Sequence, residues 1–183
     1  MIPIMSHTFL QLLQTLPGRT QNLNAGALLF QRGDPVRRVY LVTQGQMHLL
    51  RRQLDGTTSI LQRAGPGALL AEASLLSAHY HCAAEAVADT HLTHWSQSEV
   101  NTLITRDKFS ALAFAKHLAN EVREARLKAE ITSHRRVADR LDAWLTWHED
   151  GLPEKGEWHH LARELNVSPE ALYREIGRRG PHS

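Results

Sequence analysis

The stretch ALLFQRGDPVRRVYLVTQGQMHLLRRQLDGTTSILQRAGPGALL, residues 27–70, decides the fold of the first half of this chain. Its apolar runs are short and strand-like, and they are separated by turn signals that contain glycine. The turn signals are Gly33-Asp34-Pro35, Gly45, Asp55-Gly56 and Gly65-Pro66-Gly67. A later segment, AEAVADTHLTHW at 84–95, supplies a further strand or two. This regular spacing predicts an antiparallel β-sandwich or barrel over residues 22–96.

From about Ser98 the pattern becomes helical, and its main feature is a long heptad seam. Between Phe109 and Glu130 the apolar positions recur at alternating spacings of four and three residues. The seam consists of Ala111, Ala115, Leu118, Val122, Ala125 and Ala129. A sustained seam of this kind predicts a helix pair, so we expect a homodimer through residues 111–129. The alternative is a helix that packs on its own domain.

The segment EWHHLARELNVSPEALYREIGRR, residues 157–179, predicts two short helices joined by a tight turn. The buried face of the first helix consists of Trp158, Leu161, Ala162 and Leu165. Asn166 suits the left-handed conformation that ends a helix. Ser168 is then an N-cap and Pro169 the first helical residue. This pattern is typical of a helix-turn-helix, whose second helix enters the DNA major groove. The alternative is a helical hairpin packed on a core.

The second helix of this motif offers side chains suited to DNA. Glu170, Tyr173 and Arg174 fall on one side of it, and Arg178 and Arg179 follow at its end. Arginine can bond O6 and N7 of guanine, and glutamate can accept a hydrogen bond from the cytosine amino group. The paired arginines suit backbone phosphates. From Ser133 onward, however, eight lysines and arginines stand against nine aspartates and glutamates. The charge must therefore be arranged locally.

Composition excludes several classes of protein. The net charge is +2 and the chain contains one cysteine, Cys82. A single cysteine excludes an intrachain disulfide framework and suits a reducing cytosol. No apolar run approaches the roughly 20 residues of a membrane span, and the start lacks the features of a secretory signal. We therefore expect a cytoplasmic protein. No P-loop, HExxH motif or Ser/Cys–His–Asp set is present, so we expect no enzyme activity.

Four motifs in the same order resemble the CRP/FNR family of bacterial transcription regulators. The first is F-x-x-G-D followed by Y-L-V-x-x-G within residues 30–45, and the second is GPGALLAEASLLS at 65–77. The third is CAAEAVADT at 82–90, and the fourth is S-x-E-x-x-x-R on Ser168, Glu170 and Arg174. The resemblance covers residues 20–179, nearly the whole chain.

This resemblance implies an α+β fold in three parts. Residues 1–107 would form an effector-sensing β-sandwich or double-stranded β-helix of the cyclic nucleotide-binding type. Residues 108–131 would form the dimerisation helix, and residues 132–183 the helix-turn-helix domain. The resemblance also implies homodimeric binding to a palindromic DNA site, contact with RNA polymerase, and a small effector in the β-domain. Glu170 and Arg174 would read bases, and Ser168 would cap the helix and approach a phosphate.

The sequence departs from the family at the cyclic-phosphate site. Cyclic-AMP-binding members use a glutamate for the ribose, which corresponds to Glu72, and an Arg-Ser pair for the phosphate. The pair falls on Cys82 and Ala83, which supply neither a guanidinium nor a hydroxyl. A phosphodiester without a charged partner in a closed pocket would lose much of its binding energy. We therefore expect an effector site at Glu72, Cys82 and Ala83 whose ligand is not cyclic AMP bound in the usual mode.

The same segment suggests an alternative, a haem or metal-ion sensor. His79, His81 and Cys82 carry imidazole and thiol groups that ligate zinc, copper or haem iron. In the carbon-monoxide-sensing haem branch of the family, an iron-binding histidine lies three residues before a cysteine, as His79 does before Cys82. That branch's second cysteine is replaced here by Ser77. Solvated surface histidines are the other interpretation.

A second departure concerns the end of the sequence. The family continues beyond the recognition helix into a two-stranded wing, whereas this sequence ends with residues 180–183, GPHS. Without a wing we expect fewer contacts to the DNA backbone. A further alternative is therefore a sensor module that acts through protein contacts and binds DNA weakly.

Overall fold

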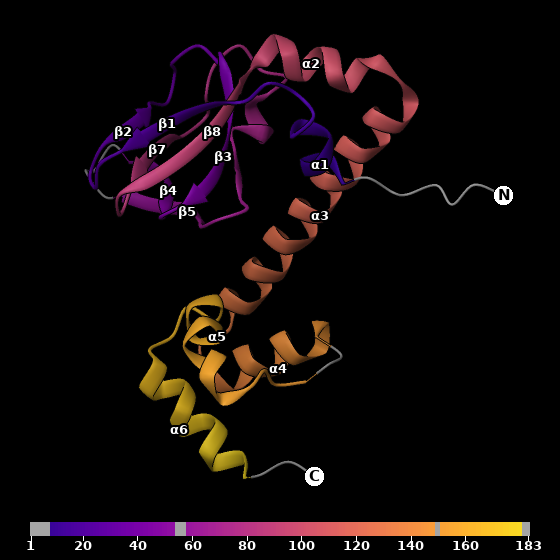
Figure 1. Ribbon diagram of the computed structural model, residues 1–183. Coiled ribbons are helices and arrows are strands. Elements are labelled where there is room, and N and C mark those ends of the chain that lie inside the picture. Colours follow the sequence, from indigo (N-terminus) through magenta and orange to yellow (C-terminus); the bar gives the residue numbers. More distant parts are fainter. Residues whose placement is uncertain (1–7, 54–57, 149–150, 181–183) are drawn as a thin grey trace, which may run out of the picture. The chain divides into compact units, whose positions relative to one another are not determined.

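The computed structural model describes residues 8–53, 58–148 and 151–180. The chain divides into two units, Met1–Leu118 and Ala119–Ser183, and the long helix α3 (Lys108–Ser133) contributes to both (Figure 1). The expected turn at Asp55-Gly56 lies outside the described residues. Unit 1 contains the strands and unit 2 is helical, as the sequence predicts.

Unit 1 is built on two antiparallel sheets of four strands each (Figure 1). The first sheet has the order β1 (Arg19–Leu23), β8 (Thr90–Ser96), β3 (Arg38–Gln44), β6 (Leu69–Leu70). The second has the order β2 (Leu28–Phe30), β7 (Ala83–Ala86), β4 (Met47–Arg52), β5 (Thr58–Ala64). The short 3-10 helix η1 (Glu72–Ser74) lies between β6 and β7. The predicted antiparallel β-domain is confirmed.

Side chains from both sheets share one core. Val42 and Leu92 from the first sheet meet Met47 and Ala84 from the second, and all four are essentially inaccessible to solvent. The hairpin between β3 and β4 turns at Gly45, whose φ of 84° favours glycine. A Cβ at this position would collide with the backbone of the segment before β8. Glycine is therefore required at this predicted turn, both by the backbone conformation and because a Cβ has no room.

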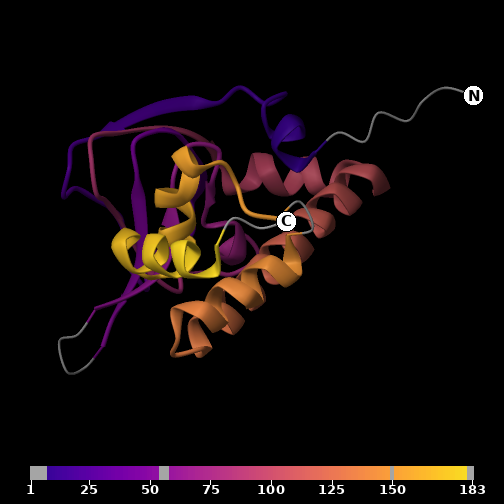
Figure 2. The same cartoon turned by 90° about the horizontal axis from the view of Figure 1, so that it is seen from below.

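A second core joins three helices to the first sheet. Helix α1 (Phe9–Leu13) begins at a capping box on Thr8, and α2 (Gln97–Arg106) begins at one on Ser96. The Phe9 ring packs against Phe114 of α3, with 4.9 Å between ring centroids. Val39, Leu75, Val100 and Leu103 belong to the same core. Figure 2 shows α1 beside α2 and the first turns of α3.

Unit 2 packs four α-helices around a separate core. The last turns of α3 are followed by α4 (Val137–Trp147), the 3-10 helix η2 (Lys155–Glu157), α5 (Trp158–Glu164) and α6 (Pro169–Arg179). The fully buried members of its core are Leu141, Leu161, Ala162, Leu165 and Leu172. The long helix extends two residues beyond the expected end at 131, to Ser133.

Ser133 ends α3 and does not cap the next helix, α4. Ser133 is the last residue of α3, and its hydroxyl donates a 2.7 Å hydrogen bond to the Glu130 carbonyl. A serine at a helix end can satisfy its hydroxyl within its own turn instead of capping the next helix. The N-cap position of α4 is occupied by Arg136, which makes no side-chain capping bond.

Candidate nucleic-acid interface and effector site

The turn between α5 and α6 has the predicted construction. Asn166 adopts the left-handed conformation with a φ of 53°. The Ser168 hydroxyl accepts a 3.2 Å hydrogen bond from the Ala171 amide, and Pro169 begins α6. Val167 packs against the core of unit 2. The two helix caps and the packed Val167 side chain together fix the direction in which α6 leaves the turn.

Arg140 of α4 also fixes this turn, and the sequence pattern did not reveal it. Its guanidinium donates to the Leu165 carbonyl at 3.0 Å and to the Asn166 carbonyl at 2.8 Å. A third bond, from Nε, reaches the His134 carbonyl at 2.8 Å. The carbonyls at the end of a helix lack partners within the helix. Arg140 satisfies them with a positive charge, which also complements the helix dipole.

Helix α6 presents one polar and one apolar face. Leu172 and Ile176 are buried against the core, whereas Glu170, Tyr173 and Arg174 are exposed. Hydrogen bonds from its own backbone amide and from Ser168 lower the pKa of Glu170, so its carboxylate stays ionised. The Tyr173 ring packs edge-to-face against Trp158, with 5.1 Å between ring centroids.

Arg174 is the least constrained side chain of this exposed face. Within the described part of the chain, it makes no hydrogen bond or ion pair. Its guanidinium therefore keeps its donors for an outside partner. The side chains expected to read bases are thus brought together on one face of α6.

The two arginines at the end of α6 differ from each other. Arg178 is 70% exposed and pairs with Glu175 at 2.9 Å. Arg179 is only 18% exposed and donates to Asp142 at 2.6 Å and to the Ala138 carbonyl at 3.0 Å, both on α4. Arg179 therefore links α6 to α4. The structure does not place it as the phosphate contact that the sequence led us to expect, because these partners on α4 hold its guanidinium inside unit 2.

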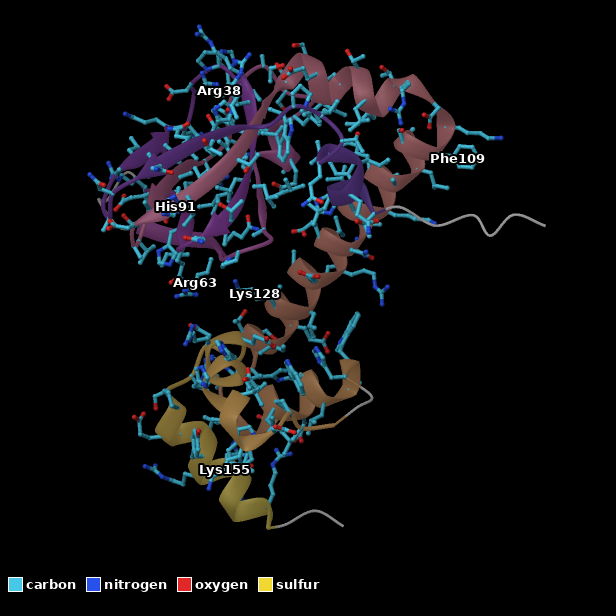
Figure 3. The ribbon with its side chains drawn as sticks, in the orientation of Figure 1. Arg38, Arg63, His91, Phe109, Lys128 and Lys155 are labelled. Carbon is cyan, nitrogen blue, oxygen red and sulfur yellow. The ribbon has the colours of Figure 1, made fainter. Side chains whose placement is uncertain are left out.

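The predicted seam of α3 is largely open to solvent. Its exposed positions are Ala111, Ala115, Val122, Ala125 and Ala129, whereas Leu118 is half-buried and packs on the second core of unit 1. Phe109 at the start of α3 is 60% exposed, and its ring projects from the helix (Figure 3). Leu112 is 52% exposed. A row of exposed apolar side chains on one helix marks a candidate interaction surface.

The expected effector residues lie where η1 approaches β7. Glu72 and Cys82 are both buried, with 9% and 2% of their surface exposed. Burial raises the pKa of the Cys82 thiol, the carboxylate of Glu72 raises it further, and the guanidinium of Arg51 opposes them. Ala83 begins β7 directly after Cys82, and it lies opposite Leu50 in the pairing with β4. The structure thus groups Glu72 with Cys82, whereas Ala83 is only partly buried.

The expected metal ligands are not brought together. His79 is exposed in a segment that bridges to Pro35, and His81 is exposed with its Nδ1 2.7 Å from the Ser74 hydroxyl. Cys82 instead faces the core. Residues 8–53, 58–148 and 151–180 contain no group of three or more His, Cys, Asp or Glu side chains that could hold a metal ion. This arrangement does not favour the haem or metal hypothesis.

The two units define a class of protein, in which a two-sheet domain of the cyclic nucleotide-binding type is followed by a helical domain that ends in two short helices, α5 and α6, joined by a tight turn. A family model for the cyclic nucleotide-binding domain matches residues 20–107. The cyclic AMP receptor protein of Thermus thermophilus is 35% identical over 155 residues, which cover 82% of this chain and 72% of that protein.

Solved structures show the same likeness. The catabolite activator protein of Thermus thermophilus matches with a TM-score of 0.54 and 30% identity, covering 88% of this chain and 78% of that chain. FixK2 of Bradyrhizobium japonicum matches with a TM-score of 0.64, covering 89% and 84% of the two chains, and its 19% identity supports the fold alone. This chain belongs to the CRP/FNR family of transcription regulators.

Among the described helices, none combines the length and the apolar character that crossing a bilayer requires.

Proposed function

We propose that this protein is a homodimeric DNA-binding regulator that controls transcription through RNA polymerase in response to a small effector. The observation that carries this proposal is the exposed face of α6. Glu170, Tyr173 and Arg174 project from a helix whose start is fixed by the Ser168 cap and whose turn is held by Arg140.

Each side chain of this face has a distinct task at DNA. The Arg174 guanidinium can donate two hydrogen bonds to guanine, and the ionised Glu170 can accept one from cytosine. Arg178, largely exposed, suits a phosphate. Ser168 and the start of α6 offer amide groups and a positive dipole end to another phosphate. Few phosphate contacts in a domain of balanced charge predict modest affinity outside specific sites.

The α3 seam supplies the means of pairing. Two copies joined through residues 111–129 would present two α6 helices related by a two-fold axis. Such a dimer reads a palindrome whose half-sites lie about one helical turn apart. The exposure of Ala111, Ala115, Val122, Ala125 and Ala129 supports this arrangement.

Cyclic AMP bound in the usual mode is not the effector that we propose. Position 82 carries a thiol whose pKa is raised, so it stays neutral and offers no positive charge to a phosphodiester. The relatives whose names refer to cyclic AMP support the domain type, while this side chain argues against phosphate binding in the usual mode. An absorption spectrum and metal analysis of freshly purified protein would test the haem alternative. A haem absorption band or a stoichiometric metal ion would favour the haem or metal sensor over the effector that we propose.

The proposed DNA contact is tested by fluorescence anisotropy on duplexes selected from a random pool. Arg174→Ala should weaken binding to the selected site by about 1–3 kcal/mol, because one bidentate base contact is lost. Arg32→Ala is the matched control, since it removes an arginine that is also exposed, but in unit 1. Wild-type protein that selects no duplex, or an Arg174→Ala variant with unchanged affinity, would contradict the proposal.

A further inference from the structure

Arg51 of β4 is a charged residue on the inner face of its sheet. Antiparallel pairing sets Met47 opposite Ala86 and Leu49 opposite Ala84, and all four side chains are buried. Continuing this register places Arg51 opposite Cys82, which is also buried in the core. Residues directly opposite each other project on the same face. The Arg51 side chain is therefore directed into the interior between the sheets.

Arg52, the next residue along β4, lies on the outer face of the sheet. Arg52 is 71% exposed and lies 3.8 Å from Glu85, which pairs with His48 on the outer face. Burial, and then the charge of Arg63, lower the pKa of this outer His48, while Glu85 opposes the shift. Figure 3 shows Arg63 projecting away from the sheet. Two consecutive arginines therefore lie on opposite faces, and only Arg51 is directed inward.

The surroundings of Arg51 are those of a binding group. Its Nε is fully buried and has no hydrogen-bond partner. It lies close enough to Cys82 and Glu72 for all three to interact electrostatically at the thiol. A buried donor of a charged group that lacks a partner destabilises the fold. The Nε donor of Arg51 is therefore available to a partner from outside the chain.

We propose that Arg51 binds the anionic group of the effector, supplying from β4 the guanidinium that position 82 lacks. The forked donors of Arg51 suit a phosphate or carboxylate, and Glu72 beside it can accept a hydrogen bond from a neighbouring hydroxyl. The effector class is thus a small hydroxylated anion. This inference rests on the proposed role of unit 1 as an effector-binding domain.

Thermal unfolding of the full chain with defined probes tests this assignment. Ribose 5-phosphate represents the phosphates, gluconate the carboxylates and ribose the neutral polyols. At a concentration of about ten times Kd, a bound anion should raise Tm by about 3 °C or more, while ribose should have no effect. The anion that gives the larger shift identifies which of the two groups the site accepts.

Arg51→Leu should abolish the shift, and Arg51→Lys should reduce it because the fork is lost. Arg52→Leu removes the same charge from the outer face and should keep the full shift. Arg51→Leu should also retain or raise the Tm of the unliganded protein, since it removes the unpartnered donor. If this variant does not fold, Arg51→Lys compared with Arg52→Lys makes the same distinction.

Two results would overturn the assignment. One is the absence of a shift with either anion in the wild type. The other is an equal shift in the wild type and the Arg51 variants, which would make Arg51 a structural counter-ion only. Duplex binding by α6 is measured without these probes. A failure of the Arg51 assignment is therefore distinguishable from a failure of the proposed DNA-binding function.

Discussion

Ala71 and Asn166 both hold the left-handed backbone conformation, one in each unit of the molecule. Ala71 has a φ of 74° directly before η1, and Asn166 has a φ of 53° between α5 and α6. Asparagine tolerates this conformation, whereas for alanine it costs roughly 1–2 kcal/mol. The turn of unit 2 therefore agrees with its local sequence. The segment before η1 in unit 1 is held against its local preference by the core around it.

This difference separates two kinds of site. Strained backbone persists where the surroundings impose it, and it gathers at ligand sites. Ala71 is 3% exposed, lies in the core between the sheets and precedes Glu72. In the α5–α6 turn, backbone conformation and residue type agree. Each residue of that turn occupies a position that its side chain favours. The α5–α6 turn is thus specified by its local sequence, whereas the segment at Ala71 is specified by the core that encloses it.

The largest effect should follow from removing the long-range support of the unit 2 turn. Arg140→Ala deletes three charge-assisted hydrogen bonds to carbonyls and should lower the free energy of unfolding by about 2–3 kcal/mol. Three of the four tryptophans, at 144, 147 and 158, lie in unit 2. Denaturation followed by tryptophan fluorescence therefore reports this unit. Arg135→Ala, at an exposed position, is the control and should change little. Equal stability of the two variants would show that Arg140 does not hold the turn.

A smaller effect is expected from setting the unit 2 turn against its own sequence. Asn166→Ala places alanine in the left-handed conformation, as at Ala71, but at an exposed position. The variant should lose about 1 kcal/mol in urea denaturation. Asn120→Ala, within the right-handed helix α3, should be neutral or slightly stabilising because alanine is the better helix former. If Asn166→Ala were as stable as Asn120→Ala, the left-handed backbone at residue 166 would not favour asparagine over alanine.

The smallest effect concerns pH and unit 1. Burial, and then the charges of Arg38 and Arg19, lower the pKa of His94, while Glu99 opposes the shift. The unfolded state therefore takes up this proton more readily. The contribution of neutral His94 is fully present above its unfolded pKa of about 6.5 and is lost as pH falls below that value.

His94→Gln should flatten the fall in Tm between neutral and mildly acidic pH. His91→Gln, on the exposed face of the same strand, should leave the fall in place (Figure 3). A fall that is as steep in the His94 variant as in the wild type would assign the pH dependence to other groups.

The features that could be predicted from the sequence are those that depend on near neighbours. The Gly45 turn, the α3 seam and the Asn166–Pro169 turn follow from spacing, caps and conformational preference. Arg140 and Arg179 were not anticipated as links because their partners lie 25 to 41 residues away. The inward direction of Arg51 likewise becomes visible only from the strand register. Neighbouring arginines in the sequence thus acquire different roles from the fold.

We propose that two copies of α6 read DNA through Arg174. The most direct test is the set of duplexes that wild-type and Arg174→Ala proteins select from one random pool. We predict a palindrome for the wild type and, for the variant, a loss of base preference at two positions related by the symmetry of that palindrome, with the other positions unchanged. An identical preference in both proteins, or a loss at a single unsymmetrical position, would contradict the account.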